Sequence, residues 1–266
     1  MIEQRRFSDQ FVFGAAVSAY QVEGNVSSER HNDWDKHFKN HPKDQPFKES
    51  EIGPDWWSFP RAEEDIGRLK ELGLQAIRLG IEWARIEPEK GRFNIRAIQR
   101  YRSIIDHIQR LGLVPLVTLN HFTLPDWLAQ DGGFSSVGFD ERFKYYAEGV
   151  AETFGDVKKW ITLNEPTITI STQYLSDAWP PREKKILSIL RVLKNMRRAN
   201  HAAYDTLKMK IPDSEVGSSH TMIWLEPNDE KSALQRGTAN ILNYLLNKAP
   251  INIVTDKGND TDFIGY

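Results

Sequence analysis

The sequence contains no cysteine, so disulfide bonds and thiolate metal sites are excluded. That absence fits a reducing compartment. The chain also lacks an excess of charge of either sign, because 35 basic and 37 acidic residues leave a formal net charge of -2. Such a balance provides no field to attract a polyanion or an anionic membrane. We therefore expect no nucleic-acid partner.

Long apolar runs are missing as well. Residues 1–20 lack the apolar core of a signal peptide, and no later segment has the uncharged length of a membrane-spanning helix. We therefore expect a cytoplasmic protein without a membrane partner. No histidine pair with a nearby carboxylate suggests a metal-ligand set, so neither a metal nor another cofactor is expected.

Short β-type runs alternate with amphipathic helical patterns along the whole chain, and no low-complexity linker interrupts them. We therefore expect one domain, 1–266. Strands are predicted at 11–16, 75–81, 113–119, 160–163, 215–219 and 262–265. Helices are predicted at 63–72, 95–111, 140–154, 184–209 and 229–246, with Asp140 capping the third and Gly73 and Gly112 following the first two.

This alternation predicts a parallel sheet covered by helices, either a doubly wound sheet or a (β/α)₈ TIM barrel. No G-x-G-x-x-G or P-loop follows a strand, which disfavours the nucleotide-binding sheet. Polar residues instead follow several strands, as in barrel sites. They are Gln21, Arg78, Asn120-His121 and Asn164-Glu165. Strand starts recur about every 50 residues, so eight units would need roughly 400 residues. The sequence thus predicts an incomplete barrel with about five to six βα units.

The strongest local signal for chemistry is Asn164-Glu165-Pro166, where Pro166 stops a strand directly after an amide and a carboxylic acid. Glycoside hydrolysis needs an acid of raised pKa to protonate the leaving oxygen, and it gains from a hydrogen bond to the sugar 2-OH. Glu165 and Asn164 suit these two roles. The alternative is a turn with a solvated glutamate.

The surrounding motifs resemble glycoside hydrolase family 1, the β-glucosidase-like enzymes, in the order of that family and over nearly the whole chain. They are FVFGAAVSAYQVEG (11–24), WD (34–35), RLGIEWARIEP (78–88), NHFTLPDWL (120–128), TLNEP (162–166), WPP (179–181), NHAAY (200–204) and DFIG (262–265). Each motif alone is weak to moderate, and together they are specific. Phe122 departs from the tryptophan that many members carry.

The resemblance implies a retaining β-glycosidase that acts on β-linked glycosides, with Glu165 as acid/base. It implies that Gln21, His121 and Asn164 bind sugar hydroxyls and that Arg78 keeps the nucleophile ionised. The family's nucleophile motif, Thr-Glu-Asn-Gly-like, would follow Tyr266 and is absent from these residues. Glu23 and Glu82 are the nearest alternative acids, but the family assigns no nucleophile to the strands that they follow.

Three hypotheses remain open at this point. The residues belong to a longer enzyme, or they form one half of a split enzyme whose other chain supplies the missing strands, or they are a non-catalytic remnant. On their own, the 266 residues are expected to have little or no glycosidase activity, because a retaining mechanism needs a second carboxylate roughly 5–5.5 Å from the acid.

Overall fold

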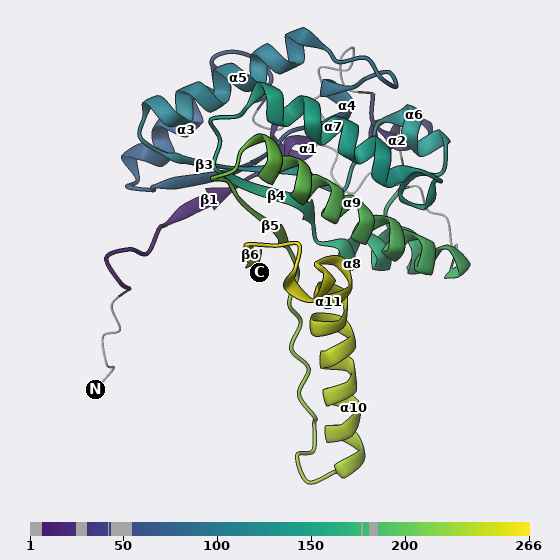
Figure 1. Ribbon diagram of the computed structural model, residues 1–266. Helices are drawn as coiled ribbons and strands as arrows, with labels where there is room; N and C mark the ends of the chain where they lie inside the picture. The colour runs from purple at the N-terminus through teal and green to yellow at the C-terminus, as the bar shows by residue number, and fades with distance from the viewer. Residues whose placement is uncertain (1–6, 25–30, 42, 44–54, 177, 181–185) are drawn as a thin grey trace.

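A computed structural model describes residues 7–24, 31–41, 43, 55–176, 178–180 and 186–266. Its centre is one sheet of parallel strands in the order β1-β2-β3-β4-β5-β6 (Figure 1). These are Gly14–Ala16, Ala76–Gly80, Val114–Asn120, Lys159–Asn164, Glu215–Ser219 and Phe263–Gly265. A doubly wound sheet reverses its strand order, whereas barrel strands follow one another in sequence. The observed order is that of a barrel.

Helices connect the strands. The longer ones are α2 (Asp33–Asn40), α3 (Arg61–Glu71), α5 (Ile95–Arg110), α7 (Phe139–Thr153), α9 (Ile189–Lys210) and α10 (Ala233–Asn243). The shorter ones are α1 (Ala19–Val22), α4 (Trp83–Ile86), α6 (Asp126–Gln130), α8 (Pro166–Thr169) and α11 (Ala249–Val254). Single turns η2 (Gly133–Ser135), η3 (Ile170–Leu175), η4 (Ile186–Ser188), η5 (Tyr244–Lys248) and η6 (Asp256–Gly258) complete them. No described helix has the length and apolarity needed to cross a membrane.

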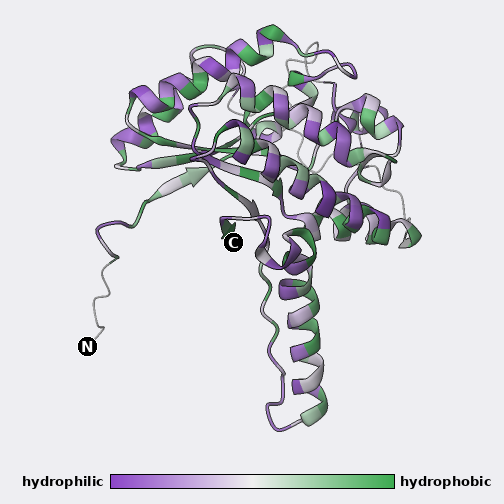
Figure 2. Cartoon of the chain, in the orientation of Figure 1, coloured by the Kyte–Doolittle hydropathy of each residue, from purple (hydrophilic) through white to green (hydrophobic). Residues whose placement is uncertain are grey.

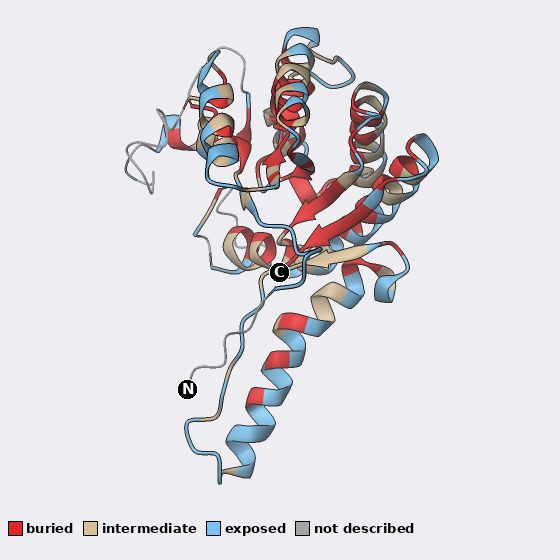
Figure 3. Ribbon diagram, turned by 90° about the vertical axis from the view of Figure 1, so that its left-hand side faces the viewer, coloured by how far each residue is buried: buried red, intermediate tan, exposed pale blue. Residues whose placement is uncertain are grey.

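The core lies between the sheet and these helices, where buried residues concentrate (Figure 3). In β2, Ile77 and Leu79 are buried in this layer, whereas Arg78 between them points to the other face of the sheet. The facing stripe of α5 buries Tyr101 and Ile108. Burying each large apolar side chain contributes roughly 1.5–3 kcal/mol, which holds the apolar side of each strand against the helices. Because successive side chains of a strand point to opposite faces, residues such as Arg78 then lie on the inner face of the sheet.

Three sequence predictions need correction or qualification. β1 begins at Gly14, not Phe11, and the preceding rings of Phe11 and Phe13 stay 44% and 47% exposed because no described strand pairs beyond them. Helix α7 begins at Phe139, so Asp140 lies in its first turn and Gly138, with a φ of 73°, is the cap. Asp140 acts there on the helix dipole. The start of the predicted helix 184–209 and Pro181 of the WPP motif lie outside the described residues.

The barrel is incomplete. β1 and β6 are the two ends of the strand order, so each leaves one backbone edge unpaired within the described chain.

Gly73 and Gly112 follow α3 and α5 with φ angles of 82° and 70°, a left-handed conformation that glycine adopts without steric cost. Helices α3 and α5 therefore end at the glycines that the sequence indicated.

Candidate active site

Three of the predicted site residues form one hydrogen-bonded chain on the inner face of the sheet. Arg78 in β2 donates from Nη2 to Oδ1 of Asn164 at the end of β4. The Nδ2 atom of Asn164 lies 3.2 Å from Nε2 of His121, which directly follows β3. Residues from three strands thus meet at the carboxyl edge of the sheet, where barrel sites are built.

An irregularity in β4 brings Asn164 to this face. Trp160 and Thr162 face the helices, where Thr162 donates to Asn200 of α9, and strict alternation would send Asn164 the same way. The pairing with β5 instead matches Ile161 to Gly217 and Asn164 to Ser219, so β4 has one residue more. Such a bulge re-aims the side chains after it. Asn164 therefore points to Arg78.

Glu165 follows Asn164 in a left-handed conformation, with φ 47° and ψ 61°. Its backbone N–H donates to the carbonyl oxygen of Ser219 at 2.7 Å. Pro166 then starts α8, a position at which proline is favoured, and it disfavours a helical conformation at Glu165. Backbone strain of this kind clusters at functional sites. The carboxylic acid is half-buried at the mouth of the half-barrel.

Gln21 lies beside this group but is not bonded to it. Gly80 links the two regions, because a Cβ added there would lie 3.2 Å from the N atom of Ala19 and 3.9 Å from the Cβ of His121. Gln21 stands two residues after Ala19 in α1, is exposed, and accepts a hydrogen bond from Ser18 Oγ at 2.8 Å. The described structure thus connects Arg78, His121 and Asn164 directly and places Gln21 on the neighbouring turn.

Burial controls the charges of this group. Burial, and after it the positive charge of Arg78, lower the pKa of His121 from 6.5 to about 3, so the imidazole is neutral near pH 7. Burial also lowers the pKa of Arg78, while the negative charge of Glu165 opposes that shift. Arg78 remains a cation, because a guanidinium does not lose its proton in proteins. One fixed positive charge therefore sits among neutral hydrogen-bonding groups beside Glu165.

Two supporting residues were missed from the sequence. Arg78 donates from Nε to Thr118 Oγ1 at 2.9 Å, and its Nη1 lies 3.5 Å from Ser219 Oγ. Both are inner-face residues of strands, and Ser219 ends β5. Ser219 could have been identified from the sequence, because it is a polar residue at the end of a predicted strand. Ser219 therefore contacts both the guanidinium of Arg78 and the backbone of Glu165.

Aromatic rings border the site. The Phe122 ring is 4.8 Å from that of His121, 4.9 Å from that of Trp179, and nearly parallel to that of Trp34 at 6.4 Å. Tyr20 packs on Trp34 at 5.1 Å, next to Gln21 in α1. Apolar ring faces of this kind suit the C–H faces of a pyranose. The site thus combines polar groups on the sheet with an aromatic wall.

The two alternative acids are committed elsewhere. Glu23 is 3% exposed and pairs with Arg85 at 2.6 Å, and it also accepts from Tyr101 Oη at 2.5 Å. Glu82 is 2% exposed and accepts from Thr123 Oγ1 at 2.9 Å. A nucleophilic carboxylate must reach the substrate, so these buried and bonded acids do not suit that role. Among the described residues we find no second acid placed like Glu165.

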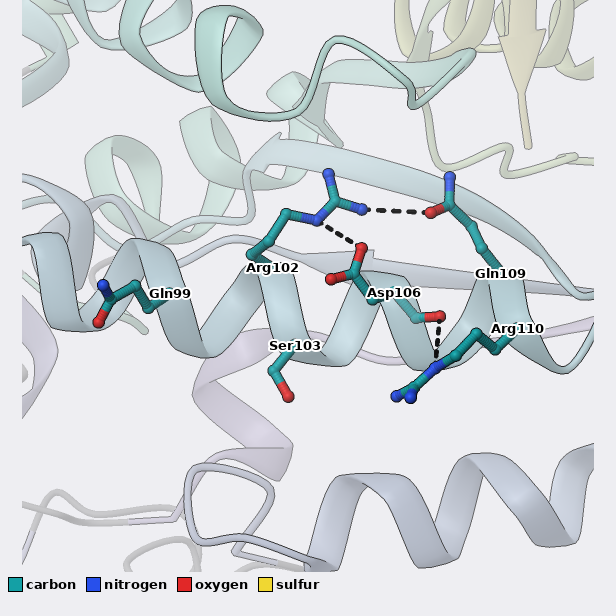
Figure 4. A pocket seen from close by; sticks show the side chains of 6 residues that line it. All are labelled: Gln99, Arg102, Ser103, Asp106, Gln109 and Arg110. Carbon is teal, nitrogen blue, oxygen red and sulfur yellow. Dashed lines mark hydrogen bonds and ion pairs between the residues drawn. The ribbon is translucent and has the colours of Figure 1, made fainter.

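A surface hollow of about 680 Å³ lies elsewhere, along the outer side of α5 (Figure 4). Its lining residues are Gln99, Arg102, Ser103, Asp106, Gln109 and Arg110. Arg102 Nε is 2.8 Å from Asp106 Oδ1, and Arg102 Nη2 donates to Gln109 Oε1 at 3.2 Å. Because all of its lining residues lie on one helix and none follows a strand, this hollow is not the candidate site.

Comparison with known proteins identifies the relatives of this chain. The family model described as glycosyl hydrolase family 1 matches residues 3–257. Cytosolic beta-glucosidase of Homo sapiens is 33% identical over 243 residues, which are 88% of this chain and 51% of that protein. Beta-glucosidase A of Thermotoga maritima is 31% identical over 230 residues, 85% of this chain and 51% of that protein.

A solved structure agrees with these matches. The β-glucosidase from Thermotoga maritima in complex with castanospermine superposes with a TM-score of 0.83 at 30% identity, and the match covers 91% of this chain and 54% of that one. The chain spans about half the length of the curated relatives that it matches.

Proposed function

The chain belongs to glycosyl hydrolase family 1, and from this premise we propose that it supplies the acid/base half of a retaining β-glucosidase site. Glu165 protonates the leaving oxygen of a β-linked glycoside and later removes a proton from water. The observation that carries the proposal is the chain Arg78–Asn164–His121 beside Glu165. It presents an amide and a neutral imidazole to sugar hydroxyls next to a carboxylic acid.

The proposed roles follow from the hydrogen-bonding capacity of each side chain. Asn164 Oδ1 accepts from Arg78 and one N–H of its Nδ2 is directed at His121, so the second N–H of Nδ2 is the donor toward the sugar 2-OH. We assign His121 and Gln21 to neighbouring hydroxyls. Arg78 is the one cation of this group, and a carboxylate placed beside it would stay ionised. We propose that a nucleophilic carboxylate outside these 266 residues takes that place.

The aromatic wall supports a sugar as the ligand class. The ring of Phe122 lies next to His121, and the rings of Trp34 and Trp179 pack around Phe122, so we propose that this wall contacts the C–H face of a pyranose. We propose the cytoplasm as the compartment, since the chain has no cysteine and a relative from Homo sapiens carries the name cytosolic beta-glucosidase. Neither a metal nor another cofactor takes part in the proposed mechanism.

A fusion tests the proposal. These 266 residues would be joined to the half of the Thermotoga maritima β-glucosidase that they do not match, and hydrolysis of 4-nitrophenyl β-glucoside would be measured. We expect turnover by the fusion and none by the 266 residues alone, because only the fusion brings a second carboxylate near Glu165. A folded fusion without turnover would favour a non-catalytic protein, and turnover by the 266 residues alone would contradict the need for an outside nucleophile.

A further inference from the structure

The chain turns sharply directly after β3, and this turn carries two residues of the candidate site. Phe122 at its centre has a φ of 76°, a value that a bulky side chain rarely allows. The N–H of Thr123 donates to the carbonyl oxygen of His121 at 3.0 Å, so the hydrogen bond spans only two residues. This angle and this bond are those of the rarer, strained form of γ-turn. Such a conformation persists only where surrounding contacts hold it.

Glu82 provides one of these contacts, through the hydroxyl of Thr123. Thr123 Oγ1 donates to the carboxylate, at 3.0 Å from Oε1 and 2.9 Å from Oε2. Figure 2 shows hydrophilic residues along the helices that cover the sheet, whereas these two polar side chains lie inside, since Glu82 is 2% and Thr123 is 4% exposed. A hydrogen bond to a carboxylate is roughly twice as strong as a neutral one. The residue after Phe122 is therefore anchored two positions beyond the end of β2.

Glu82 is itself held in place from two directions. Its backbone N–H donates to Tyr101 Oη at 2.9 Å, which ties the start of α4 to α5. Asn32, which is 0% exposed, donates from Nδ2 to Glu82 Oε1 at 3.4 Å. The carboxylate thus contacts the turn after β3 and the residue that caps α2 at the same time.

The start of α2 holds the far end of the turn. Asp33 Oδ1 accepts from the N–H of Leu124 at 2.9 Å, and the N–H of Asp33 donates to the carbonyl oxygen of Leu124 at 3.0 Å. Asn32 and Pro125 form an antiparallel bridge next to these bonds. The two residues that follow Phe122 are therefore fixed by side chains from two other parts of the chain.

We propose that Glu82 is a positioning residue, which holds the strained turn at Phe122 and thereby places His121 and Phe122 in the candidate site. The inference rests on the proposed function, since these two residues are the ones assigned to the sugar. His121 Nε2 lies 3.2 Å from Asn164 Nδ2. The Phe122 ring packs 4.9 Å from that of Trp179. Both contacts depend on the direction in which the turn presents the two side chains.

A purely structural role for Glu82 is the competing interpretation, and it predicts a different result. A buried hydrogen bond stabilises a fold wherever it lies, so lost stability alone does not separate the two roles. Without its anchor, Phe122 relaxes to a negative φ, which rotates the peptide group that joins it to His121. The imidazole then leaves Asn164, whose amide nitrogen keeps the ring proton on Nδ1. Only the positioning role predicts this change at His121.

The first experiment removes the hydroxyl that Glu82 holds. Nitrogen-15 NMR of the imidazole at pH 7 measures the tautomer of His121 in the 266 residues. We expect Thr123→Val, which keeps the shape of the side chain, to give a mixture of both tautomers. Thr123→Ser keeps the hydroxyl and should retain the Nδ1–H form. Thr123→Ala replaces the valine variant if circular dichroism shows that the latter is unfolded.

Two further substitutions test Glu82 directly, and one serves as a control. Glu82→Ala removes the acceptor and should give the same mixture of tautomers, whereas Glu82→Gln keeps an oxygen for Thr123 and should retain the Nδ1–H form. The matched control is Thr255→Val, because Thr255 is 0% exposed and its hydroxyl donates to the carbonyl oxygen of Ile251 at 2.8 Å, within α11. This control should leave the tautomer of His121 as it is.

The second experiment places the same substitutions in the fusion with the Thermotoga maritima half and measures kcat and KM for 4-nitrophenyl β-glucoside. Displaced His121 and Phe122 bind the sugar less well in the ground state and in the transition state. We therefore expect Thr123→Val to raise KM by about tenfold, the effect of one lost hydrogen bond, with a smaller change in kcat. Partial unfolding reduces the active fraction and so lowers kcat without raising KM, which is the most that Thr255→Val should do.

The outcomes separate this inference from the proposed function. A tautomer of His121 that is unchanged in Thr123→Val and Glu82→Ala overturns the positioning role, and so does an equal change in Thr255→Val. A change confined to the variants that lose the bond between Glu82 and Thr123 supports it. A fusion without turnover, even when unsubstituted, counts against the proposed function alone, because the tautomer measured in the 266 residues still decides what Glu82 does.

Discussion

Asn164 presents its amide nitrogen, not its oxygen, to Nε2 of His121, at 3.2 Å. The orientation is set by Arg78, which can only donate and therefore takes the amide oxygen. Nε2 of His121 must then accept, so the neutral ring carries its proton on Nδ1.

The first prediction is this tautomer. Nitrogen-15 NMR of the imidazole should show His121 as the neutral Nδ1–H form from pH 7 down to about pH 4, because burial and Arg78 lower the pKa of His121 to about 3. Replacing Arg78 with Met removes both the charge and the restraint on the amide. The pKa should then rise, and the tautomer preference should weaken. A ring that is protonated at pH 5.5 in the unaltered chain would contradict this arrangement.

Buried histidines should also make the chain acid-sensitive. Burial lowers the pKa of His220, which lies 2.8 Å from Ser218 Oγ, from 6.5 to about 4. Between these values the unfolded chain binds the proton and the folded chain does not, so stability rises with pH in this window. The stability contributed by neutral His220 is fully present above pH 6.5 and is lost as the pH falls toward 4, by roughly 1.4 kcal/mol per pH unit.

Urea unfolding at pH 7, 6 and 5 measures this effect. His220→Gln removes the titrating group and should flatten the pH slope by about one histidine. His41→Gln, at the exposed end of α2, is the matched control and should leave the slope as it is. Equal slopes for both variants and the parent would show that His220 is not buried as described.

The buried pair of Glu23 and Arg85 should be structural. Their side chains are 4% and 0% exposed at a separation of 2.6 Å, and the Arg85 guanidinium also lies over the Trp57 ring. Glu23→Gln leaves a buried cation without its counter-charge, which should cost about 3–5 kcal/mol of unfolding free energy. The control Glu89→Gln breaks an exposed pair with Arg92 and should cost under about 1 kcal/mol. A similar loss for both variants in urea titrations would refute the assignment.

Much of the fold could be predicted because local patterns and tertiary packing agree. The buried stripe of α5 and the strand 215–219 appear where periodicity put them. The start of β1 was predicted three residues too early, because pairing with β2 begins only at Gly14. The residues at Phe11 give no sign that a partner strand is missing there. Asp140 was misread because Gly138 already provides the turn that starts α7.

The sequence indicated which residues belong to the site but not the hydrogen bonds that join them. Alternation along β4 would have pointed Asn164 away from Arg78, and only the bulge relative to β5 reverses this. A bulge depends on how two distant strands pair, so the sequence of β4 alone does not reveal it. Thr118 and Ser219 were missed because their role comes from Arg78, which lies on another strand, although Ser219 also stands at a strand end, where polar site residues gather.

Asn243 at the end of α10 and Asn247 in η5 bond to the extended segment that follows β5, and they allow a local prediction. Asn243 protects the amide of Leu225, and Asn247 protects that of Ile223. In Asn243→Ala, hydrogen–deuterium exchange at Leu225 should accelerate by about tenfold or more, since its hydrogen bond to the side chain is lost. Ile223 is the internal control and should change far less. Unchanged exchange at Leu225 would mean that the helix and the extended segment are held by other contacts.

The last prediction concerns Glu165 in the active fusion. Glu165→Gln keeps the shape of the side chain and removes its proton, so substrates with poor leaving groups should lose far more of the glycosylation rate than activated aryl glycosides, which need little acid assistance. Deglycosylation should slow for every substrate, because water then lacks its general base. Azide needs no base, and it should restore turnover and give a β-glycosyl azide, since two inversions retain the configuration. Ser219→Ala, which alters a neighbour of Arg78 but keeps the backbone carbonyl that accepts from Glu165, is the control and should show no azide rescue. Equal losses for activated and unactivated substrates in the Gln variant, without azide rescue, would show that Glu165 is not the acid/base.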